Sequence, residues 1–282
     1  MSRITRPLRV GIIGTGGIAG QHIDGYKKAE GVELVAACDV VESRAIGMKE
    51  KHGFQLHFTS WEEMIKHADL DAVSVCTPPF AHLEPTVGAI EAGLHVLCEK
   101  PMALTVADCE KIIFKALQVS RQVFCVMQNR YSPPSIWIKE MVESGRLGKI
   151  YMVQLNCYWN RDERYYKKNT WKGTQQLDGG TLFTQFSHWI DLLYWLFGDI
   201  TSIQAKFADF NHQSLTEFED SGFVNFAFTN GGMGSINYST SVWDKNLESS
   251  ITIIGSNGSV KVGGQYMDKV EYCHIKNYTL PQ

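Results

Sequence analysis

Short apolar runs alternate with amphipathic segments through the first 125 residues. The apolar runs lie at 8–14, 32–39, 56–58, 71–77, 95–99 and 122–129. The segments between them predict helices at 17–29, 42–52, 60–68, 81–92 and 105–119, the third with Ser60 and Glu63 in a capping-box pattern. Short β-branched strands separated by helices are typical of a parallel sheet covered on both faces. Ligands of such sheets bind beyond the carboxyl ends of the strands.

The pattern changes near residue 149. An alternating run at 149–159 and a polar, aromatic stretch at 160–177 precede an apolar helix expected at about 179–197. Longer alternating runs then follow at 201–210, 221–241 and 248–264, joined by Asn-Gly and Gly-Gly turns. Such turns are typical of antiparallel hairpins. We therefore predict an α/β chain with a nucleotide-binding domain at 1–125 and an α+β domain with a mostly antiparallel sheet at 126–282.

Composition narrows the choice of function. The chain has 282 residues, 44% of them hydrophobic and 20% charged, which is ordinary for a soluble enzyme. Its formal charge of −3 favours neither nucleic acid nor an anionic membrane as a partner, and no apolar stretch is long enough to cross a bilayer. The 7 cysteines are scattered without metal-ligand spacing, which predicts reduced thiols, a cytoplasmic location and no metal. The chain stops without a closing helix, which fits either a natural end or a missing C-terminal part.

A glycine-rich loop follows the first apolar run. Gly14, Gly16 and Ala19 fit the pattern G-x-G-x-x-A, which turns a strand into a helix and brings its backbone close to a pyrophosphate. We expect a Rossmann domain in which Gly14, Thr15, Gly16, Gly17, Ile18 and Ala19 bind a dinucleotide. Asp39 ends the second strand, where a carboxylate accepts from ribose hydroxyls and repels a 2′-phosphate. This favours NAD over NADP, although Arg44 could still accommodate NADP.

Two further strand ends carry candidate residues. Cys76, Thr77, Pro78 and His82 belong to "CTPPFAH", where the cofactor crevice should lie; His82 could equally be a packing residue. Lys100 ends the next strand. A lysine is often a surface salt-bridge partner. Beside an oxidised nicotinamide, however, the pKa of an ammonium is lowered, and the neutral amine could then take a proton from a substrate hydroxyl. Glu99 could orient Lys100 or bind ribose.

Polar residues form a stripe along the expected helix at 179–197. Thr181, Thr184, His188 and Asp191 recur at three- and four-residue intervals. Such a stripe on an apolar helix normally faces a cavity or a polar interface. His188 is either a buried histidine satisfied by Asp191 or a group that hydrogen-bonds the reacting hydroxyl.

The stretch at 160–177 is basic in an otherwise acidic chain. It carries five Lys or Arg residues against two acids, interleaved with Tyr and Trp. Arginine beside aromatic rings suits an anionic ligand with a flat or sugar portion. A solvated charged loop is the alternative.

The chain resembles the Gfo/Idh/MocA oxidoreductases. The resemblance rests on the Gly14–Ala19 loop, "CTPPFAH", "EKP", "MQNRYSPP", "ESGRLGKI" and "DGGTLFTQFSHWIDLLYWLFG", which span nearly the whole chain. It implies a Rossmann domain followed by a sheet domain, and catalytic roles for Lys100 and His188. Gln128, in "MQNRYSPP", joins the cofactor-binding candidates. Many members have aspartate four residues before the histidine, where this chain has Thr184.

Within the family the chain is most similar to the UDP-N-acetylglucosaminuronate 3-dehydrogenases. That resemblance implies hydride transfer between NAD and a sugar or nucleotide-sugar. It makes substrate-binding candidates of Arg161, Tyr165, Tyr166, Trp171, Lys172, Thr184, Gln185 and His188. The alternatives are a myo-inositol or aldose dehydrogenase and a non-catalytic NAD-sensing regulator. The alternating strands of the second domain predict a half-covered sheet, and hence a homodimer or homotetramer.

Overall fold

The computed structural model describes residues 6–167 and 170–280. The chain divides into two compact units, Met1–Val126 and Met127–Gln282, with the boundary one residue after the expected position. No helix in the described part of the chain is long and apolar enough to span a membrane.

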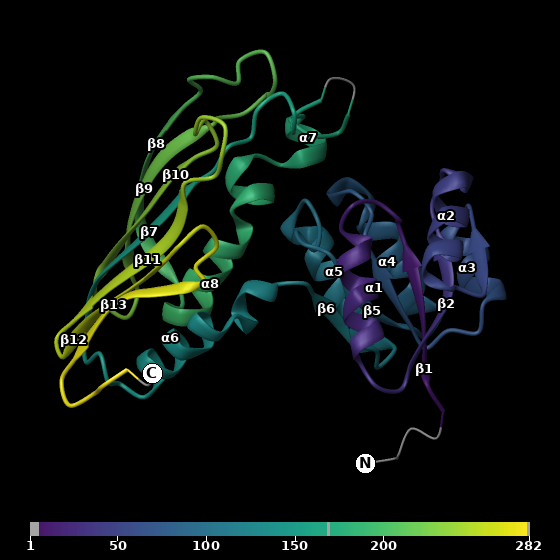
Figure 1. The fold of residues 1–282 in the computed structure, drawn as a ribbon, viewed down its shortest axis with the longest axis horizontal. Coiled ribbons are helices and arrows are strands. Elements are labelled where there is room, and N and C mark those ends of the chain that lie inside the picture. The colour runs from purple at the N-terminus through teal and green to yellow at the C-terminus, as the bar shows by residue number, and fades with distance from the viewer. Residues whose placement is uncertain (1–5, 168–169, 281–282) are drawn as a thin grey trace. The chain divides into compact units, whose positions relative to one another are not determined.

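The first unit is built on a six-stranded parallel sheet (Figure 1). Its strands are β1 (Leu8–Ile13), β2 (Val32–Cys38), β3 (Leu56–Phe58), β4 (Ala72–Val75), β5 (His95–Cys98) and β6 (Val123–Cys125). Its helices are α1 (Ala19–Lys28), α2 (Glu42–His52), α3 (Trp61–His67), the 3₁₀ turn η1 (Pro79–Ala81), α4 (Leu83–Glu91) and α5 (Val106–Gln118). The spatial order β3-β2-β1-β4-β5-β6 confirms the doubly wound fold, in which ligands bind where the order reverses, between β1 and β4.

Helices cover both faces of this sheet because its strands are apolar on both sides. The neighbouring residues Ile12 and Ile13 point in opposite directions and belong to different hydrophobic clusters. Ile12 shares its cluster with Ile23 of α1, whereas Ile13 shares its cluster with Met64 of α3 and Ile90 of α4. The near-continuous apolar runs in the sequence are explained by this double coverage.

The second unit is built on a seven-stranded sheet. Its strands are β7 (Ile150–Tyr158), β8 (Ile200–Ala208), β9 (Ser221–Phe228), β10 (Met233–Ser239), β11 (Glu248–Gly255), β12 (Gly258–Gly263) and β13 (Lys269–Ile275). In the order β13-β12-β11-β7-β10-β9-β8 every pair is antiparallel except β7 with β10, which confirms the mostly antiparallel sheet. Gly231 and Gly232 have positive φ and make the turn between β9 and β10.

Two helices pack on one face of this sheet (Figure 1). The helical segments of the unit are η2 (Gln128–Tyr131), α6 (Pro133–Glu143), α7 (Gln175–Asp178), η3 (Thr181–Gln185) and α8 (Ser187–Phe197). Ile138 of α6 and Leu192 of α8 are fully buried with Leu155 of β7 and Ile251 of β11 in one core. The opposite face carries exposed apolar side chains, among them Met152, Phe223, Met233 and Ile254.

The prediction of a single helix at 179–197 is wrong for the first half of that segment. Gly179 and Gly180 have positive φ, residues 181–185 form one π-helical turn, and Phe186 has a non-helical backbone before α8 begins. A π turn changes which residues share a face, so the polar stripe is not continuous. Instead, the hydroxyls of Thr181 and Thr184 donate to the backbone carbonyls of Glu219 and Asp178.

Candidate functional site

The glycine loop between β1 and α1 is shaped by two different needs. Gly14 has a φ of 88°, and a Cβ there would lie 2.7 Å from the backbone nitrogen of Thr77. Gly16 and Gly17, in contrast, have nothing within 4 Å of a Cβ position. The loop therefore packs tightly at Gly14 against the backbone that follows β4, whereas Gly16 and Gly17 have open space beside them. This arrangement, at the N-terminus of α1, fits a pyrophosphate.

Asp39 stands beside this loop. Its Oδ2 accepts hydrogen bonds from the backbone N–H and the hydroxyl of Thr15, both at 2.9 Å, and its Oδ1 accepts from the N–H of Val41 at 2.9 Å. Arg44 lies exposed in the first turn of α2. The structure thus brings Asp39 to the phosphate loop, while its contact with ribose remains a prediction.

Apolar side chains are exposed around the same edge of the sheet. Ile18 follows β1, Val40 and Val41 follow β2, and Phe80 follows β4, and all four are exposed. Since β2, β1 and β4 are neighbours, these side chains offer an apolar surface for a flat adenine ring. Only Ile18 was expected from the sequence; the available signal was an apolar residue directly after a strand end. The residues present fit a bound dinucleotide.

His82 joins the loops that follow β4 and β5. It is buried, with Nδ1 2.7 Å from the carbonyl oxygen of Pro101 and Nε2 2.8 Å from that of Thr77. Burial lowers the pKa of this imidazole. Thr77 also donates from its hydroxyl to the carbonyl of Ala81 at 2.8 Å. His82 therefore holds the strand-tip loops in place, which matches the packing role left open above.

Glu99 lies in a buried network that reaches the backbone of Lys100. Its Oε1 is 2.8 Å from Nε2 of His22, and its Oε2 accepts the N–H of Lys100 at 3.0 Å. His22 continues through Nδ1 to the hydroxyl of Ser74 at 3.1 Å, which in turn meets the hydroxyl of Tyr26 at 2.7 Å. Burial alone would raise the pKa of Glu99, but the interactions with His22 and Lys100 outweigh it and lower that pKa.

This network ends at the backbone N–H of Lys100. Lys100 is partly exposed at the end of β5, and its bond to Pro101 is cis. Neither His22 nor Ser74 is marked by any sequence motif, since they come from α1 and β4. Both roles considered for Glu99, orienting Lys100 and binding ribose, stay predictions.

His188 lies in the first turn of α8, next to the residues that start the second unit. Nε2 of His188 is 3.2 Å from Nε2 of Gln128. One turn further on, Asp191 binds the guanidinium of Arg130 through two hydrogen bonds of 2.7 and 2.5 Å. Asp191 therefore pairs with arginine.

Arg161 is a half-buried cation that stacks on aromatic rings. Its guanidinium carbon lies 4.6 Å from the ring centre of Trp159 and 5.0 Å from that of Tyr165. It donates from Nε to Gln185 Oε1 at 2.7 Å and from a terminal nitrogen to Asn246 at 3.3 Å. Burial lowers the pKa of Arg161. None of the ion pairs among the described residues gives Arg161 a carboxylate partner.

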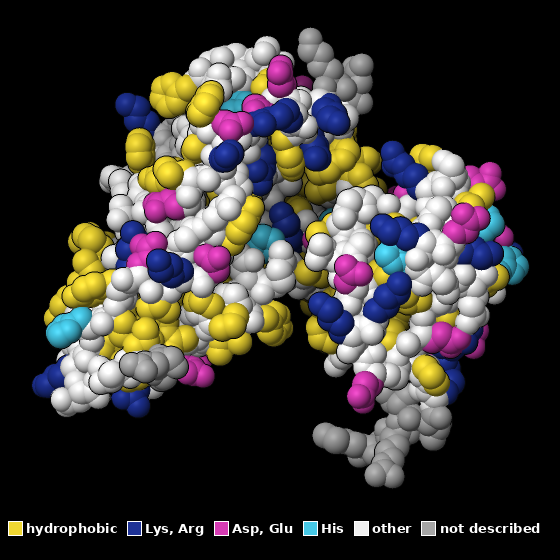
Figure 2. Space-filling model, viewed as in Figure 1, with side chains coloured by type: hydrophobic (Ala, Val, Ile, Leu, Met, Phe, Trp, Pro, Cys, Tyr) yellow, Lys and Arg dark blue, Asp and Glu magenta, His cyan; other side chains and the backbone are white. Residues whose placement is uncertain are grey.

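The neighbours of Arg161 complete a cationic, aromatic cluster. Gln185 donates to the hydroxyl of Tyr165 at 2.7 Å, and the ammonium of Lys172 lies 3.8 Å from the centre of the Tyr165 ring. Burial also lowers the pKa of Lys172. Figure 2 shows Lys and Arg side chains gathered at the end of this unit where α7 lies in Figure 1. The structure thus brings together four of the predicted substrate-binding residues: Arg161, Tyr165, Lys172 and Gln185.

The remaining candidates lie around this cluster. Trp171 is 5.9 Å from the ammonium of Lys172. Tyr166 is buried and packs edge-on against Tyr165 and His212, so it supports the cluster from behind. Sequence reasoning missed Asn246 and His212, which reach Arg161 from distant loops and carry no motif.

Lys100 and His188 belong to different units. Lys100 follows the end of β5 in the first unit, and His188 lies at the start of α8 in the second. Their convergence over a nicotinamide remains a prediction.

Comparisons with known proteins match both units. A family model described as "Oxidoreductase family, NAD-binding Rossmann fold" matches residues 8–127, and one described as "GFO/IDH/MocA C-terminal domain" matches residues 136–261. The crystal structure of the WlbA dehydrogenase from Bordetella pertussis in complex with NADH and UDP-GlcNAcA is 34% identical, with a TM-score of 0.91 over 96% of this chain and 84% of that one.

Two curated relatives act on other sugars and polyols. D-glucoside 3-dehydrogenase of Escherichia coli is 30% identical over 80% of this chain and 68% of its own length. Myo-inositol 2-dehydrogenase of Thermotoga maritima is 28% identical over 90% of this chain and 74% of its own length.

Proposed function

The chain belongs to the Gfo/Idh/MocA family of NAD-binding oxidoreductases, and from this premise we propose that it oxidises a hydroxyl group of a nucleotide-linked sugar acid. One observation carries the choice of substrate: the half-buried guanidinium of Arg161 has no carboxylate partner among the described residues. A desolvated cation is costly unless an anion meets it. A carboxylate or phosphate of the substrate supplies that anion, and the Tyr165 ring offers a flat surface beside it.

Lys100 is the proposed base. In oxidation its neutral amine takes the proton of the substrate hydroxyl while hydride leaves the same carbon, so that the carbon becomes a carbonyl. Bound NAD supplies the hydride acceptor, C4 of its nicotinamide ring. Glu99 fixes the backbone from which Lys100 extends.

His188 is the proposed second hydrogen-bonding group at the reacting oxygen. Its Nε2 lies near Gln128, and Thr184, which stands where many relatives have aspartate, is engaged with the carbonyl of Asp178. Proton transfer is therefore assigned to Lys100 and His188 alone, without a carboxylate as a third group.

Replacement of the proposed base tests this function. We expect Lys100→Ala to lower kcat about 10²- to 10⁴-fold, because general base catalysis contributes that much, while the dissociation constant of NADH stays within about threefold of wild type. NADH formation from UDP-N-acetylglucosaminuronate and NAD is the measurement, with fluorescence titration for the cofactor. Lys115→Ala, on the surface of α5, is the control. Unchanged turnover in Lys100→Ala would contradict the assigned base.

A polyol or neutral aldose substrate is the second candidate, because the identity to myo-inositol 2-dehydrogenase extends over 90% of the chain. Higher kcat/KM for myo-inositol or D-glucose than for the sugar acid would favour it. No NADH formation from any of these substrates would favour the NAD-sensing regulator.

We also propose that the chain forms a homo-oligomer through the outer face of its second sheet. Met152 of β7 pairs in register with Met233 on one side and Ile254 on the other, and all three are exposed. A row of exposed apolar side chains across three strands is typical of an interaction surface.

A further inference from the structure

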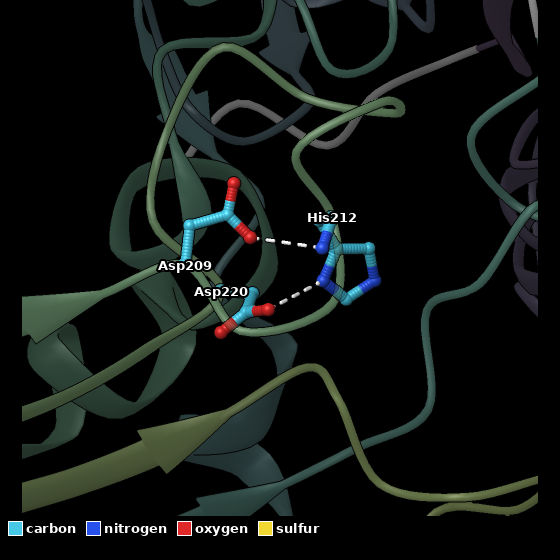
Figure 3. Close-up of side chains that lie close together, drawn as sticks. All are labelled: Asp209, His212 and Asp220. Carbon is cyan, nitrogen blue, oxygen red and sulfur yellow. Dashed lines mark hydrogen bonds and ion pairs between the residues drawn. The ribbon is translucent and has the colours of Figure 1, made fainter.

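The loop between β8 and β9 holds a cluster of Asp209, His212 and Asp220, of which His212 and Asp220 are buried (Figure 3). Each of the three residues offers one potential metal-ligand atom, and these atoms lie within 4.8 Å of one another. Among the described residues, no other group of three or more His, Cys, Asp and Glu side chains meets this criterion. Those atoms are used in hydrogen bonds. Asp209 Oδ1 accepts the backbone N–H of His212 at 2.8 Å, and Asp220 Oδ2 lies 3.0 Å from His212 Nδ1.

The second ring nitrogen of His212 reaches a different loop. His212 Nε2 hydrogen-bonds the backbone carbonyl of Arg161, 51 residues earlier in the chain. Both ring nitrogens therefore face oxygen acceptors. The ring thus joins the loop between β8 and β9 to the backbone at Arg161.

Further hydrogen bonds fix Asp220 beside this ring. Its Oδ2 also accepts the backbone N–H groups of Phe210 and Asn211 at 2.9 and 2.8 Å. Burial alone would raise the pKa of Asp220, but hydrogen bonds from serine hydroxyls, a backbone N–H and His212 lower it. The side chains of His212 and Asp220 are each only 1% exposed, so water does not screen the pair.

The peptide groups of Arg161 are held on both sides. Its N–H donates to the carbonyl of Thr240 at 2.9 Å, and its carbonyl accepts from His212. Tyr166, five residues further on, packs its ring against the His212 ring with 5.6 Å between their centres. The backbone that carries this guanidinium is thus held by Thr240, directly after β10, on one side and by the His212–Asp220 pair on the other.

We propose that the His212–Asp220 pair is a positioning element for anion recognition, which holds Arg161 so that its guanidinium meets the carboxylate or phosphate of the substrate. This inference rests on the proposed function. It assigns His212 and Asp220 no contact with the substrate; they act through Arg161.

Binding measurements with two nucleotide sugars test the proposal. The probes are UDP-N-acetylglucosaminuronate and UDP-N-acetylglucosamine, which has the same diphosphate but no sugar carboxylate. Both are titrated by calorimetry into the NADH-bound enzyme, and kcat is measured with the acid. We expect His212→Gln to weaken binding of the acid about tenfold, with kcat within about twofold and NADH affinity unchanged. Weakening confined to the acid places Arg161 on the sugar carboxylate, and equal weakening of both places it on the diphosphate. Both outcomes support the positioning role.

Two further variants separate this role from general damage. Asp209→Asn keeps an acceptor for the backbone N–H of His212 and should bind like wild type. Asp220→Asn keeps the shape of its side chain, removes its charge and should change binding in the same direction as His212→Gln. Both proteins are checked for a cooperative thermal transition, so that a poorly folded variant is recognised.

The double variant Arg161→Gln/His212→Gln gives the decisive comparison. If His212 acts through Arg161, the two effects on affinity do not add, and His212→Gln has little effect in the Arg161→Gln background. Additive effects, or an equal loss of NADH affinity, would overturn the inference. Wild-type enzyme that binds neither nucleotide sugar would contradict the proposed function and this inference with it, whereas wild-type affinity in His212→Gln overturns the inference alone.

Discussion

Single side chains in this protein gain their roles from the charge that faces them. Glu99 is buried against His22 and the N–H of Lys100, and those partners compensate for the loss of water around its carboxylate. Arg161 is stacked on aromatic rings and meets only neutral partners among the described contacts. The first arrangement stabilises the fold; the second leaves a positive charge for a ligand.

The carboxylate of Glu99 should contribute pH-dependent stability. Its folded-state pKa is lowered from an ordinary value of 4.5, so the contribution is complete above that pH and is lost as the pH falls through the folded-state pKa. We expect Glu99→Gln to reduce the free energy of unfolding at pH 7 by about 1–3 kcal/mol. The difference from wild type should shrink below pH 4.5.

Urea unfolding at pH 7 and at pH values below 4.5 measures this difference. Glu110→Gln, exposed on α5, is the control and should match wild type throughout. A difference between Glu99→Gln and wild type that is constant with pH would contradict the role assigned to the charge.

At the scale of secondary-structure elements, the turns at the ends of strands and helices decide which side chains reach the candidate site. The loop from β1 into α1 separates folding from ligand binding within three residues, because Gly14 touches the backbone after β4 whereas Gly16 faces open space. In the second unit, the π-helical turn at 181–185 decides which side chains face one another. It turns Gln185 toward Arg161, while the following helix α8 carries His188.

Alanine substitutions in the glycine loop should separate these two needs. Gly14→Ala is expected to lower the free energy of unfolding by about 1–3 kcal/mol, because its φ is positive and its Cβ would press on Thr77. Gly16→Ala is expected to change stability by less than about 1 kcal/mol but to weaken NADH binding about tenfold or more, since its methyl group would occupy the pyrophosphate approach. Chemical unfolding and fluorescence titration give the two quantities. Equal loss of stability in both variants would refute the distinction.

At the scale of the whole molecule, the two sheets differ in what covers them. The parallel sheet has helices on both faces, whereas the second sheet has α6 and α8 on one face and exposed Met152, Met233 and Ile254 on the other. Burying such a surface removes apolar area from water, which stabilises association. A second copy of the chain offers a matching face.

A charge in the middle of this row should disrupt the proposed oligomer. Met152→Glu would place a carboxylate between Met233 and Ile254, and burying it there is unfavourable. We expect the wild type to have the mass of a dimer or tetramer in light scattering after size-exclusion chromatography, and Met152→Glu to shift to a smaller species. Phe114→Glu, exposed on α5, should leave the mass unchanged. A monomeric wild type would refute the proposal.

The sequence by itself determined most of the elements and their order, although it did not predict α6 or β13. Burial has a local period, so apolar runs predicted the strands of the parallel sheet and β7 to β12, and the glycine loop and "EKP" marked the strand ends where residues such as Gly14 and Lys100 lie. It could not show the break at Phe186, because a single π turn is rare and the helical period of the apolar residues does not mark it.

Only the tertiary structure decided which polar groups meet. His22 and Glu99 are 77 residues apart, and Arg161 and His212 are 51 apart. No local periodicity relates such pairs, and each forms because burial leaves a polar atom in need of a partner wherever the fold supplies one. The sequence predicted Arg161 and Gln185 separately as substrate-binding residues. Their joint arrangement around Tyr165 depends on packing between distant loops.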